Sequence, residues 1–467
     1  MKMQRKAQES QSGTSKKVPC LLLGRDIKLG DELAVGGEGR IFAISELIIR
    51  GKRNTYSKEV HSRYVAKIFH KPNPEKVAKL RAMIANPPHD PTLEALHHVS
   101  IAWPVALILH QGKCIGFVMP YIERSTSFPL LKMYNPRDRE SLKVGYTWEY
   151  LLYMAHNLAY LLEELHRKGY VVGDLNESNI LVTKNAAVTL VDCDSVQVPK
   201  ELQWWERLLF WRRPCFRCTV GKPEYTAPEL QGYRFSEINR KSDHDNYALA
   251  VIIFLLLMEG RHPYAGVWTG SGEPPTQEQS MRARDFPYGS SRTFAPSKRA
   301  LPFDTLPPPV QQLMLDCFDH RPWFLWFQKR PTSYDWKHAL ERSEGLLIHC
   351  SINYSHVYSG HLEACPWCRR MQLGLPDPFP PGRVQVSNQA ASHESMPRGI
   401  RRFFTRLARF CLLPLTVTLY AIEGYYLLRY NSWLNHLLWQ IVVILWLFIL
   451  LLPVVLYFAL SRRIRSF

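Results

Sequence analysis

The 467-residue sequence lacks a secretory leader, a disulfide framework and internal repeats. Residues 1–17 are polar and basic and contain no apolar stretch, which excludes a signal peptide of the usual kind. Most of the 10 cysteines stand alone in apolar or strand-like contexts, without the spacing of a disulfide-rich domain. We therefore expect a large cytosolic N-terminal part in a reducing compartment, preceded by a disordered basic tail at 1–17.

Acidic residues are also scarce, with 41 Asp and Glu against 59 Lys and Arg and a net charge of +18. The surplus lies at the two ends of the chain. Nine arginines and a single acid, Glu423, follow residue 396, and five basic residues accompany Glu9 within residues 1–19. The globular middle carries no basic stripe and no nucleic-acid-binding motif, so no nucleic-acid partner is expected and a membrane surface is favoured instead.

Two apolar stretches lie in the C-terminal region 401–467. Residues 437–460 form a 24-residue run without charge, which exceeds the roughly 20 residues that span a bilayer. Residues 410–428 are interrupted only by Pro414 and Glu423. Because arginines flank the pair on both outer sides, the positive-inside rule predicts a two-span hairpin with both flanks in the cytoplasm. The alternative is an interfacial helix at 401–428 followed by one span.

The secondary-structure pattern of the globular part changes along its length. Short β-branched runs dominate from residue 18 to 121, with one helical pattern at 75–85, and longer helical patterns follow. A linker rich in proline, glycine and serine covers 374–400. This order predicts an α+β fold with a small β-rich lobe, a hinge near 120–122 and a larger α-rich lobe. The later helices are expected at 150–166, 245–259, 306–318 and 332–342.

Two segments of the β-rich part suggest a phosphate site. The sequence 33–42 is a glycine-rich turn containing Gly36, Gly37 and Gly39, whose backbone N–H groups can approach a phosphate, although such a turn alone is often only a turn. Lys67 lies inside the apolar strand 64–69 and needs an anionic partner or a route to solvent. Either a phosphate or a position on a sheet edge would satisfy Lys67.

Carboxylates and an amide follow in the α-rich part. Asp174 and Asn179 lie in the segment 173–182, and Asp192 comes thirteen residues after Asn179. The oxygens of Asn179 and Asp192 are of the kind that Mg²⁺ prefers, and Asp174 can accept the proton of a hydroxyl group. The segment 221–229, with Ala227-Pro228-Glu229, completes the set.

In order and spacing these segments resemble the protein kinase superfamily over about residues 20–345, most like the bacterial eukaryotic-type serine/threonine kinases. The resemblance implies a two-lobed kinase-like domain at 18–345, ATP with Mg²⁺ or Mn²⁺ as cofactors, and a protein substrate. The glycine-rich loop, with Ala34 where the first glycine usually stands, would cover the ATP phosphates, and Lys67 would hold the α- and β-phosphates. Glu75 and Glu94 both remain candidates for the glutamate that pairs with Lys67.

The resemblance assigns the remaining roles by position. Asp174 matches the catalytic aspartate, and Asn179 and Asp192 match the two metal ligands. Glu229 is expected to pair with Arg330, and Asp245 to brace the catalytic loop. Met119 matches the gatekeeper, and Tyr121 and Ile122 the hinge residues that contact adenine.

Four departures from the family pattern affect the expected mechanism. Val172-Gly173 replaces the usual His-Arg, so a phosphate on the activation segment has lost its usual partner. Asn176 stands where a lysine is usual, and Lys222 where a threonine is usual. We therefore predict that Lys222 reaches back and supplies the missing catalytic charge, the alternative being a solvated loop lysine. Asp194 replaces a glycine, which predicts a segment that flips less freely.

A Cys/His motif follows at 346–373. Cys350, His356, Cys365 and Cys368 supply the thiolate and imidazole ligands of a tetrahedral zinc site, with His361 as a spare. The segment is too short to fold by core burial alone, so zinc would supply its stability, unless these are unrelated cytosolic thiols. Cys215 and Cys218 also have metal-like spacing, but they lack a second pair.

Taken together, the sequence predicts a membrane-anchored, Mg-ATP-dependent serine/threonine protein kinase. The competing interpretation is a pseudokinase that serves as a membrane-attached scaffold. The retention of Lys67, Asp174, Asn179 and Asp192 favours the enzyme, because degenerate kinases typically lose at least one of these residues.

Overall fold

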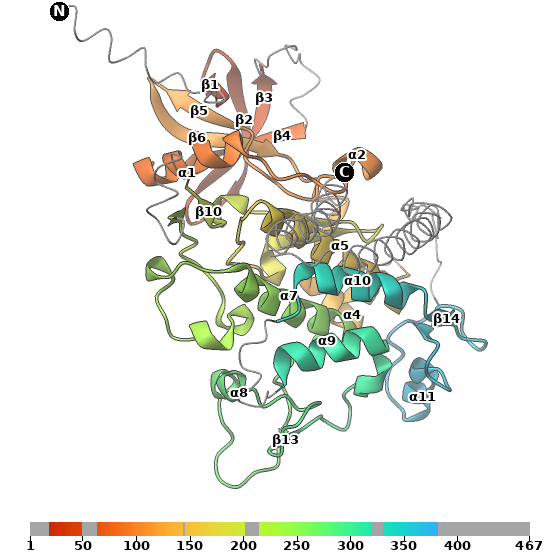
Figure 1. Cartoon of the computed structure of the whole chain (residues 1–467). Helices are drawn as coiled ribbons and strands as arrows, with labels where there is room; N and C mark the ends of the chain where they lie inside the picture. Colours follow the sequence, from red (N-terminus) through yellow and green to blue (C-terminus); the bar gives the residue numbers. More distant parts are fainter. Residues whose placement is uncertain (1–17, 49–62, 143–144, 201–213, 320–329, 382–467) are drawn as a thin grey trace, which may run out of the picture. The chain divides into compact units, whose positions relative to one another are not determined.

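The structure is a computed structural model that describes residues 18–48, 63–142, 145–200, 214–319 and 330–381 (Figure 1). The chain divides into two units, Met1–Ala390 and Ala391–Phe467. The tail 1–17, most of the linker, and the two predicted spans at 410–428 and 437–460 lie outside the described residues. Among the helices of the described ranges, none combines the length and the apolar character needed to cross a membrane.

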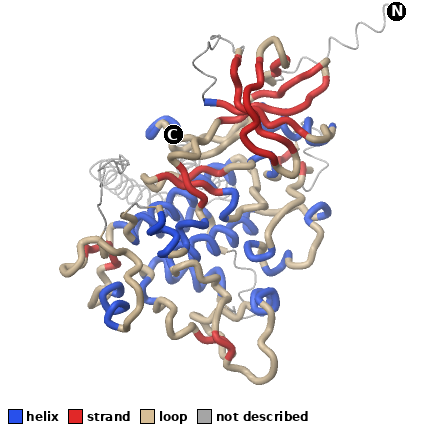
Figure 2. Tube along the Cα trace, turned by 180° about the vertical axis from the view of Figure 1, so that it is seen from behind, coloured by secondary structure: helices blue, strands red, loops and turns tan. Residues whose placement is uncertain are grey.

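A six-stranded sheet with the order β1-β5-β6-β4-β3-β2 forms the β-rich lobe (Figure 2). In β4, Lys67 pairs with Ile41 on one side and Phe117 on the other, so it occupies an inner strand. The alternative of a lysine reaching solvent from a sheet edge is therefore wrong. The strands are β1 (Cys20–Leu22), β2 (Ile27–Val35), β3 (Gly39–Leu47), β4 (Tyr64–Phe69), β5 (Ala106–His110) and β6 (Lys113–Pro120).

Helix α1 (Pro74–Ala85) confirms the predicted helix at 75–85. It begins where the Asn73 side chain accepts a hydrogen bond from the Glu75 N–H (2.8 Å), with proline in the first turn, where its missing N–H costs nothing. Leu80 and Met83 are fully buried, and Trp103 Nε1 donates to the Met83 carbonyl (2.9 Å). The helix is thereby fixed to the strand-rich lobe. A short helix α2 (Leu93–Leu96) follows.

The α-rich lobe is centred on α7 (Ser242–Leu257), in which every side chain from residue 245 to 257 is buried. A helix that is apolar all round is stable only inside a core, as the sequence predicted for this segment. The two helices α5 and α10 make an extensive mutual contact beside it. The other predicted helices are present as α5 (Trp148–Arg167), α9 (Pro308–Phe318) and α10 (Ser333–Glu344).

Small elements complete this lobe. Strands β7, β8 and β9 form a three-stranded sheet that carries the catalytic-loop segment, and β10 pairs with β11 across the start of the activation segment. Their bounds are β7 (Ser127–Pro129), β8 (Ile180–Thr183), β9 (Val188–Leu190), β10 (Val198–Pro199), β11 (Cys215–Phe216), β12 (Val267–Trp268) and β13 (Phe294–Ala295). The remaining helices are α3 (Leu131–Tyr134), α4 (Pro136–Ser141) and α8 (Gln277–Ala283).

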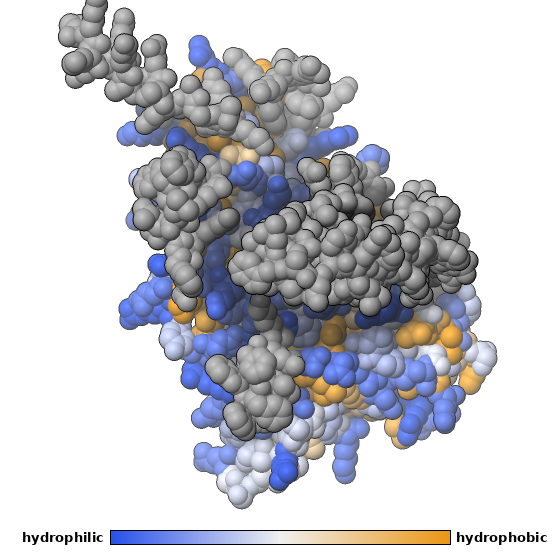
Figure 3. Space-filling model, viewed as in Figure 1, coloured by the Kyte–Doolittle hydropathy of each residue, from blue (hydrophilic) through white to orange (hydrophobic). Residues whose placement is uncertain are grey.

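The Cys/His motif forms a small module of β14 (Leu347–His349), β15 (Val357–Ser359) and α11 (Pro366–Gln372). Its fully buried Trp367 lies against Trp148 of α5, with ring centroids 6.0 Å apart, and Arg370 forms an ion pair with Glu259 (2.8 Å). The module is therefore packed onto the α-rich lobe. It also exposes large apolar side chains such as Ile352 and Leu373, and apolar surface gathers over this part in Figure 3.

Candidate active site

The glycine-rich turn connects β2 to β3 at the open end of the sheet. Gly36 N–H donates to the Gly39 carbonyl (2.9 Å), and the His70 ring contacts the Gly36 carbonyl (3.0 Å). A Cβ atom at Gly39 would lie 2.3 Å from the backbone oxygen of Ile68, so only glycine allows β3 to approach β4 this closely. At Gly37 the corresponding space is open. The loop therefore has open space at Gly37 and tight backbone packing at Gly39.

Lys67 is paired with two aspartates. Its Nζ lies 2.7 Å from Asp192 Oδ1 and 2.7 Å from Asp194 Oδ1, and its side chain is 9% exposed. Burial alone would lower the pKa of Lys67, but the carboxylates of Asp194 and Asp192 outweigh it and raise that pKa. The described contacts of Lys67 do not include Glu75. The side chain of Glu94, the other candidate, lies outside the described residues. Sequence reasoning singled out Asp194 as a departure from the family pattern but missed its pairing with Lys67.

A second lysine joins this group, which we call the ionic cluster: Glu38, Lys67, Lys76, Asp192 and Asp194. Lys76 Nζ lies 3.3 Å from Asp194 Oδ2 and also contacts Glu38 in the glycine-rich loop. The Asp194 side chain is only 2% exposed. Burial would raise its pKa, but Lys67 and Lys76 hold the pKa of Asp194 below its ordinary value. Asp194 is therefore ionised and fixed from two sides.

Asp192 has the features of a functional rather than a structural residue. Its φ angle of +58° places it in the left-handed region, which is uncommon for residues other than glycine and recurs at active sites. Its side chain is 52% exposed although one oxygen contacts Lys67. The Val191 N–H donates to the Asn179 carbonyl (2.9 Å), which brings Asn179 and Asp192 onto adjacent strand ends. Their oxygens fit the hard donors that a magnesium ion requires.

In the catalytic loop, two amides hold Asp174. Asn176 Nδ2 donates to Asp174 Oδ1 (2.8 Å), and Asn179 Nδ2 donates to Asp174 Oδ2 (3.1 Å). Asn176 is 1% exposed, so it holds the aspartate from within the fold. The residue that replaces the usual lysine thus orients the carboxylate of Asp174.

The contact predicted for Asp245 is present. Its carboxylate accepts the N–H groups of Val172 (2.7 Å) and Gly173 (2.8 Å), and His166 Nε2 lies 3.0 Å from it. Asp245 is 1% exposed on the central helix α7. Because two consecutive amides bind one buried carboxylate, the backbone just before Asp174 is held rigidly.

Arg240 occupies the space where the sequence lacks an arginine. Its guanidinium donates to the Gly173 carbonyl and to the Val220 carbonyl (2.6 Å), and it lies over the Phe235 ring at 3.9 Å. Gly173 has φ +73°, and an added Cβ would lie 2.7 Å from Arg240 Nη1 and 2.8 Å from Cys218 Sγ. Arg240 therefore joins the catalytic loop to the activation segment without a phosphate.

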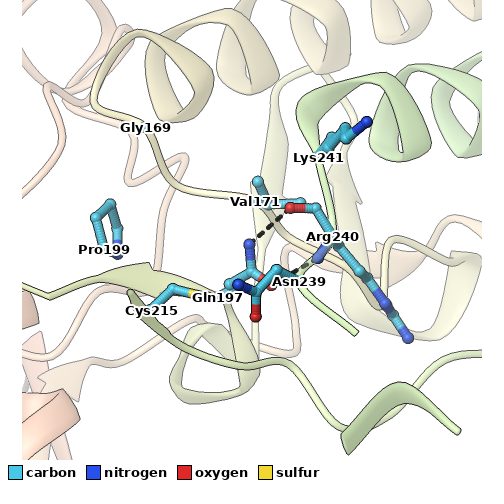
Figure 4. A pocket seen from close by; sticks show the side chains of 8 residues that line it. All are labelled: Gly169, Val171, Gln197, Pro199, Cys215, Asn239, Arg240 and Lys241. Carbon is cyan, nitrogen blue, oxygen red and sulfur yellow. Dashed lines mark hydrogen bonds between the residues drawn. The ribbon is translucent and has the colours of Figure 1, made fainter. Parts of the chain in front are cut away.

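The backbone of Arg240 is fixed as firmly as its side chain. Gln197 Nε2 donates to the Arg240 carbonyl (2.8 Å), and the Arg240 N–H donates to Gln197 Oε1 (2.9 Å), as Figure 4 shows. An open cleft of about 370 Å³ lies beside this pair, lined by residues such as Gly169, Cys215 and Lys241. None of the residues predicted to hold nucleotide lines this cleft.

Lys222 reaches the catalytic loop, as its predicted role requires. Its Nζ lies 2.8 Å from Glu177 Oε1 and 2.6 Å from Ser178 Oγ. Both partners lie between Asp174 and Asn179 in sequence. A role for Lys222 in phosphoryl transfer stays a prediction, because the described contacts are to Glu177 and Ser178.

The predicted pair of Glu229 and Arg330 is present. The guanidinium makes two hydrogen bonds of 2.6 Å to the carboxylate, and a third of 2.7 Å to Asp243. Burial would raise the pKa of Glu229, but Arg330 lowers it to about 2. The end of the activation segment is thus anchored to the α-rich lobe.

The hinge residues follow β6. Met119 pairs with Val65 in the sheet and packs against the main core, whereas Tyr121 is 39% exposed. The Tyr121 N–H donates to the Arg63 carbonyl (2.8 Å), and Ile122 is half-buried. Met119 is thus directed inward and Tyr121 outward at the junction of the lobes.

The four predicted zinc ligands lie together. Cys350, His356, Cys365 and Cys368 are all buried, and their ligand atoms lie within 4.8 Å of one another. His356 Nδ1 is 3.4 Å from Cys368 Sγ, and the two sulfurs of Cys350 and Cys368 are 3.6 Å apart. Ligands about 2.3 Å from a tetrahedral zinc would be about 3.8 Å apart, so the spacing fits this ion. The spare, His361, instead contacts Ser359 and Asp304.

The side chains of Asp377 and Asn353 support this group from behind His356. His356 Nε2 lies 2.9 Å from Asp377 Oδ1 and 3.0 Å from Asn353 Nδ2. Metal-bound histidines commonly use their second nitrogen in this way, because a carboxylate fixes the tautomer and orients the ring. Sequence reasoning did not select Asp377, because it lies in the segment assigned to the linker 374–400.

The chain is similar to proteins named as kinases, although no family model matches it. It is 33% identical over 360 residues to protein kinase YegI of Escherichia coli O157:H7, over 75% of this chain and 50% of that protein. The protein kinase YegI of strain K12 is 34% identical over 355 residues, with 74% and 49% covered. A probable serine/threonine-protein kinase of Dictyostelium discoideum is 23% identical over 242 residues, with 52% and 15% covered.

The chain thus spans about half the length of the Escherichia coli relatives that it matches. These similarities support the protein kinase superfamily that the sequence motifs indicate. The mixed α+β architecture, with a β-sheet lobe and a helical lobe, is consistent with a kinase fold.

Proposed function

We propose that this chain is a protein kinase that transfers the γ-phosphoryl group of Mg-ATP to a protein hydroxyl. The single observation that supports this most is the meeting of Lys67 with Asp192 across 125 residues, beside a catalytic loop in which Asn179 holds Asp174. Mg²⁺, when bound, would neutralise phosphate charge, and Asn179 and Asp192 are the residues that would hold it.

The proposed step uses the chain's own groups as follows. Lys67 binds phosphate oxygens, and Asp174 accepts the hydrogen bond of the substrate hydroxyl and orients it. The bond between that hydroxyl oxygen and the γ-phosphorus forms while the bond from the γ-phosphorus to the β,γ-bridging oxygen breaks. ADP leaves with that oxygen, and Asp174 takes the hydroxyl proton. Asn176 keeps Asp174 in the required orientation.

We propose serine or threonine as the acceptor. This is supported by the sequence resemblance and by the printed name of the Dictyostelium relative alone. The competing proposal, a scaffold that binds nucleotide without transferring phosphate, draws on the missing arginine before Asp174 and on Asp194.

Radiolabelled Mg-ATP with the purified full chain in detergent tests the function. Wild type should incorporate phosphate into itself or into a generic serine/threonine acceptor, and Asp192→Ala should lose at least about a thousandfold in rate. Phosphoamino-acid analysis then separates serine and threonine from tyrosine. If neither protein incorporates phosphate although wild type binds Mg-ATP, the scaffold proposal replaces the enzyme.

We further propose that the Cys/His cluster holds a structural zinc ion. The burial of all four ligands, their mutual spacing and the carboxylate behind His356 support this. Metal analysis of the purified chain should give about one zinc per molecule, and Cys368→Ser should abolish it. Cys215→Ser is the matched control, because Cys215 lies outside the cluster. A wild-type chain without stoichiometric zinc would contradict the proposal.

We propose, from the sequence alone, that residues 401–467 anchor the chain in a membrane with the kinase-like part in the cytoplasm. Single cysteines at Asn431 and Ser466, in a background lacking other reactive cysteines, test the topology. An impermeant thiol reagent applied outside intact cells should label position 431 and not 466. Labelling of position 466 and not 431 would favour one span with an interfacial helix, and labelling of neither would contradict the proposed crossing.

A further inference from the structure

One carboxylate holds two lysines beside the glycine-rich loop. Asp194 Oδ1 lies 2.7 Å from Lys67 Nζ, and its Oδ2 lies 3.3 Å from Lys76 Nζ. Asp194 sits in a short 3₁₀ turn, Cys193–Ser195, that begins directly after Asp192. The two lysines, by contrast, come from a sheet strand and from helix α1. Asp194 therefore connects three separate elements of the β-rich lobe and the activation segment.

Helix α1 contributes positive charge to this region. Lys76 enters the ionic cluster, and Lys79, one turn later, is only 8% exposed. The acid on this helix, Glu75, is exposed in the first turn, where its N–H is capped by Asn73. Because α1 presents lysines inward, it adds like charge near Lys67 and cannot neutralise it.

A buried lysine without a fixed acid would lose its position or its charge. Asp192 alone is a poor anchor for Lys67, because it is 52% exposed and is itself the residue expected to turn toward a metal. Asp194, at 2% exposed, has no such competing task. The geometry thus separates the two aspartates into a metal ligand and an anchor.

We propose that Asp194 is the positioning residue for phosphate binding: it fixes the ammonium groups of Lys67 and Lys76 beside the glycine-rich loop. This rests on the proposed function and deepens it. Asp194 belongs to the same turn as Asp192, the proposed metal ligand. The position of Lys67 therefore does not depend on helix α1. Lys76, through Glu38, extends the same anchor to the glycine-rich loop.

Calorimetric titration of the full chain in detergent with two probes, Mg-ATP and adenosine, tests this role. Asp194→Asn should weaken Mg-ATP binding about tenfold or more, the loss expected for one charged contact, and leave adenosine binding within about twofold. Glu75→Gln, the matched control on α1, should change neither affinity. Asp194→Glu keeps the charge but displaces it, so it should recover part of the Mg-ATP affinity.

A double-mutant cycle distinguishes positioning from general stability. If Asp194 acts through Lys67, the affinity for Mg-ATP of Lys67→Met/Asp194→Asn should fall little below that of Lys67→Met alone. Multiplicative losses, an equal loss of adenosine affinity, or a loss in Glu75→Gln would each overturn the proposal. If Asp194→Asn does not fold, Asp194→Ser replaces it, and wild-type Mg-ATP affinity in that uncharged variant would overturn the proposal as well.

The two proposals fail in different ways. A wild-type chain that binds Mg-ATP but transfers no phosphate loses the enzymatic function, whereas the binding role of Asp194 is still measured. A chain whose wild type binds no Mg-ATP loses both. If wild type transfers phosphate and Asp194→Asn binds Mg-ATP as tightly as wild type, only the proposed role of Asp194 is lost.

Discussion

The ionic cluster is centred on the buried Asp194 and the Cys/His cluster on the buried His356, but the two clusters balance charge differently. In the ionic cluster, each lysine has a carboxylate within 3.3 Å. In the Cys/His cluster the ligand atoms face one another, and the described hydrogen bonds of these ligands include none from a lysine or arginine. The first cluster therefore supplies its own counter-charges, whereas the second, as the proposed zinc site, would receive its counter-charge from the bound ion.

The two regions therefore differ in how far their order depends on what they bind. A cluster whose lysines are already paired with carboxylates can keep its geometry before nucleotide arrives, which reduces the reorganisation needed for binding. If the Cys/His cluster binds zinc as proposed, the ion orders the ligands, so metal binding and folding of the module become one process. Four substitutions test this contrast, and Cys365→Ser is expected to destabilise the chain most.

Cys365→Ser should have the largest effect. Loss of one ligand should cost about 5 kcal/mol or more of stability in the module and expose Trp367, because binding of structural zinc contributes on the order of 10 kcal/mol. Tryptophan fluorescence and limited proteolysis at 346–381 measure this, with Cys20→Ser as the control. A variant that keeps a protected module would show that the cluster, too, is self-sufficient.

Arg240→Ala tests a cation that is balanced by carbonyl groups instead of a carboxylate. It removes the bonds to Gly173 and Val220, so we expect a loss of about 3 kcal/mol in unfolding free energy. Arg240→Lys should recover less than half, because an ammonium group cannot reproduce the guanidinium fork. Urea unfolding measures both. An alanine variant as stable as wild type would mean that these Arg240 hydrogen bonds add no net stability.

Glu229→Gln tests a complete ion pair. We expect a loss of about 2 kcal/mol, since the carboxylate is partly exposed and Arg330 retains Asp243. The folded pKa of Glu229 is lowered to about 2, so its contribution is present above its unfolded pKa, 4.5, and is lost as the pH falls from there toward 2. Wild type should lose this stability contribution at acid pH, and Glu229→Gln should not. Equal acid sensitivity of the two proteins would contradict the role of ionised Glu229.

Glu344→Gln tests an acid with acidic neighbours. Burial, Glu341 and Glu149 raise the pKa of Glu344 to about 7, so the folded state holds a proton that the unfolded state releases above its ordinary pKa of 4.5. Wild-type stability should therefore fall as the pH rises from about 4.5 to 7. Allowing for solvent screening, the variant should gain about 1 kcal/mol at pH 8 and lose this dependence. Thermal unfolding at pH 5 and pH 8 decides.

The sequence predicted most of the fold, because long helices such as α5 and α7 repeat apolar residues at helical spacing. It placed Asp245 and the pair of Glu229 and Arg330 correctly through motif spacing. It did not find the partner of Lys67, because Asp194 lies 127 residues away and periodicity carries no information over that separation. Lys76 on α1 was readable as a charge, but its direction depends on tertiary packing.

Arg240 was missed for the same reason. It lies 67 residues from Gly173, in the loop before α7, and nothing local marks it as different from another surface arginine. The four residues of the Cys/His cluster were found because their spacing is local, within 19 residues. Asp377, in contrast, belongs to a segment that the sequence indicated only as the start of a linker.

The crowding around Gly173 limits how the chain can vary. A side chain at position 173 would occupy the space of the Arg240 guanidinium and the Cys218 sulfur, so an arginine in the catalytic loop and an arginine at 240 exclude each other. In related sequences, positions 173, 218 and 240 should therefore change together or not at all. An arginine restored at position 173 would have to displace the Arg240 guanidinium and the Cys218 side chain.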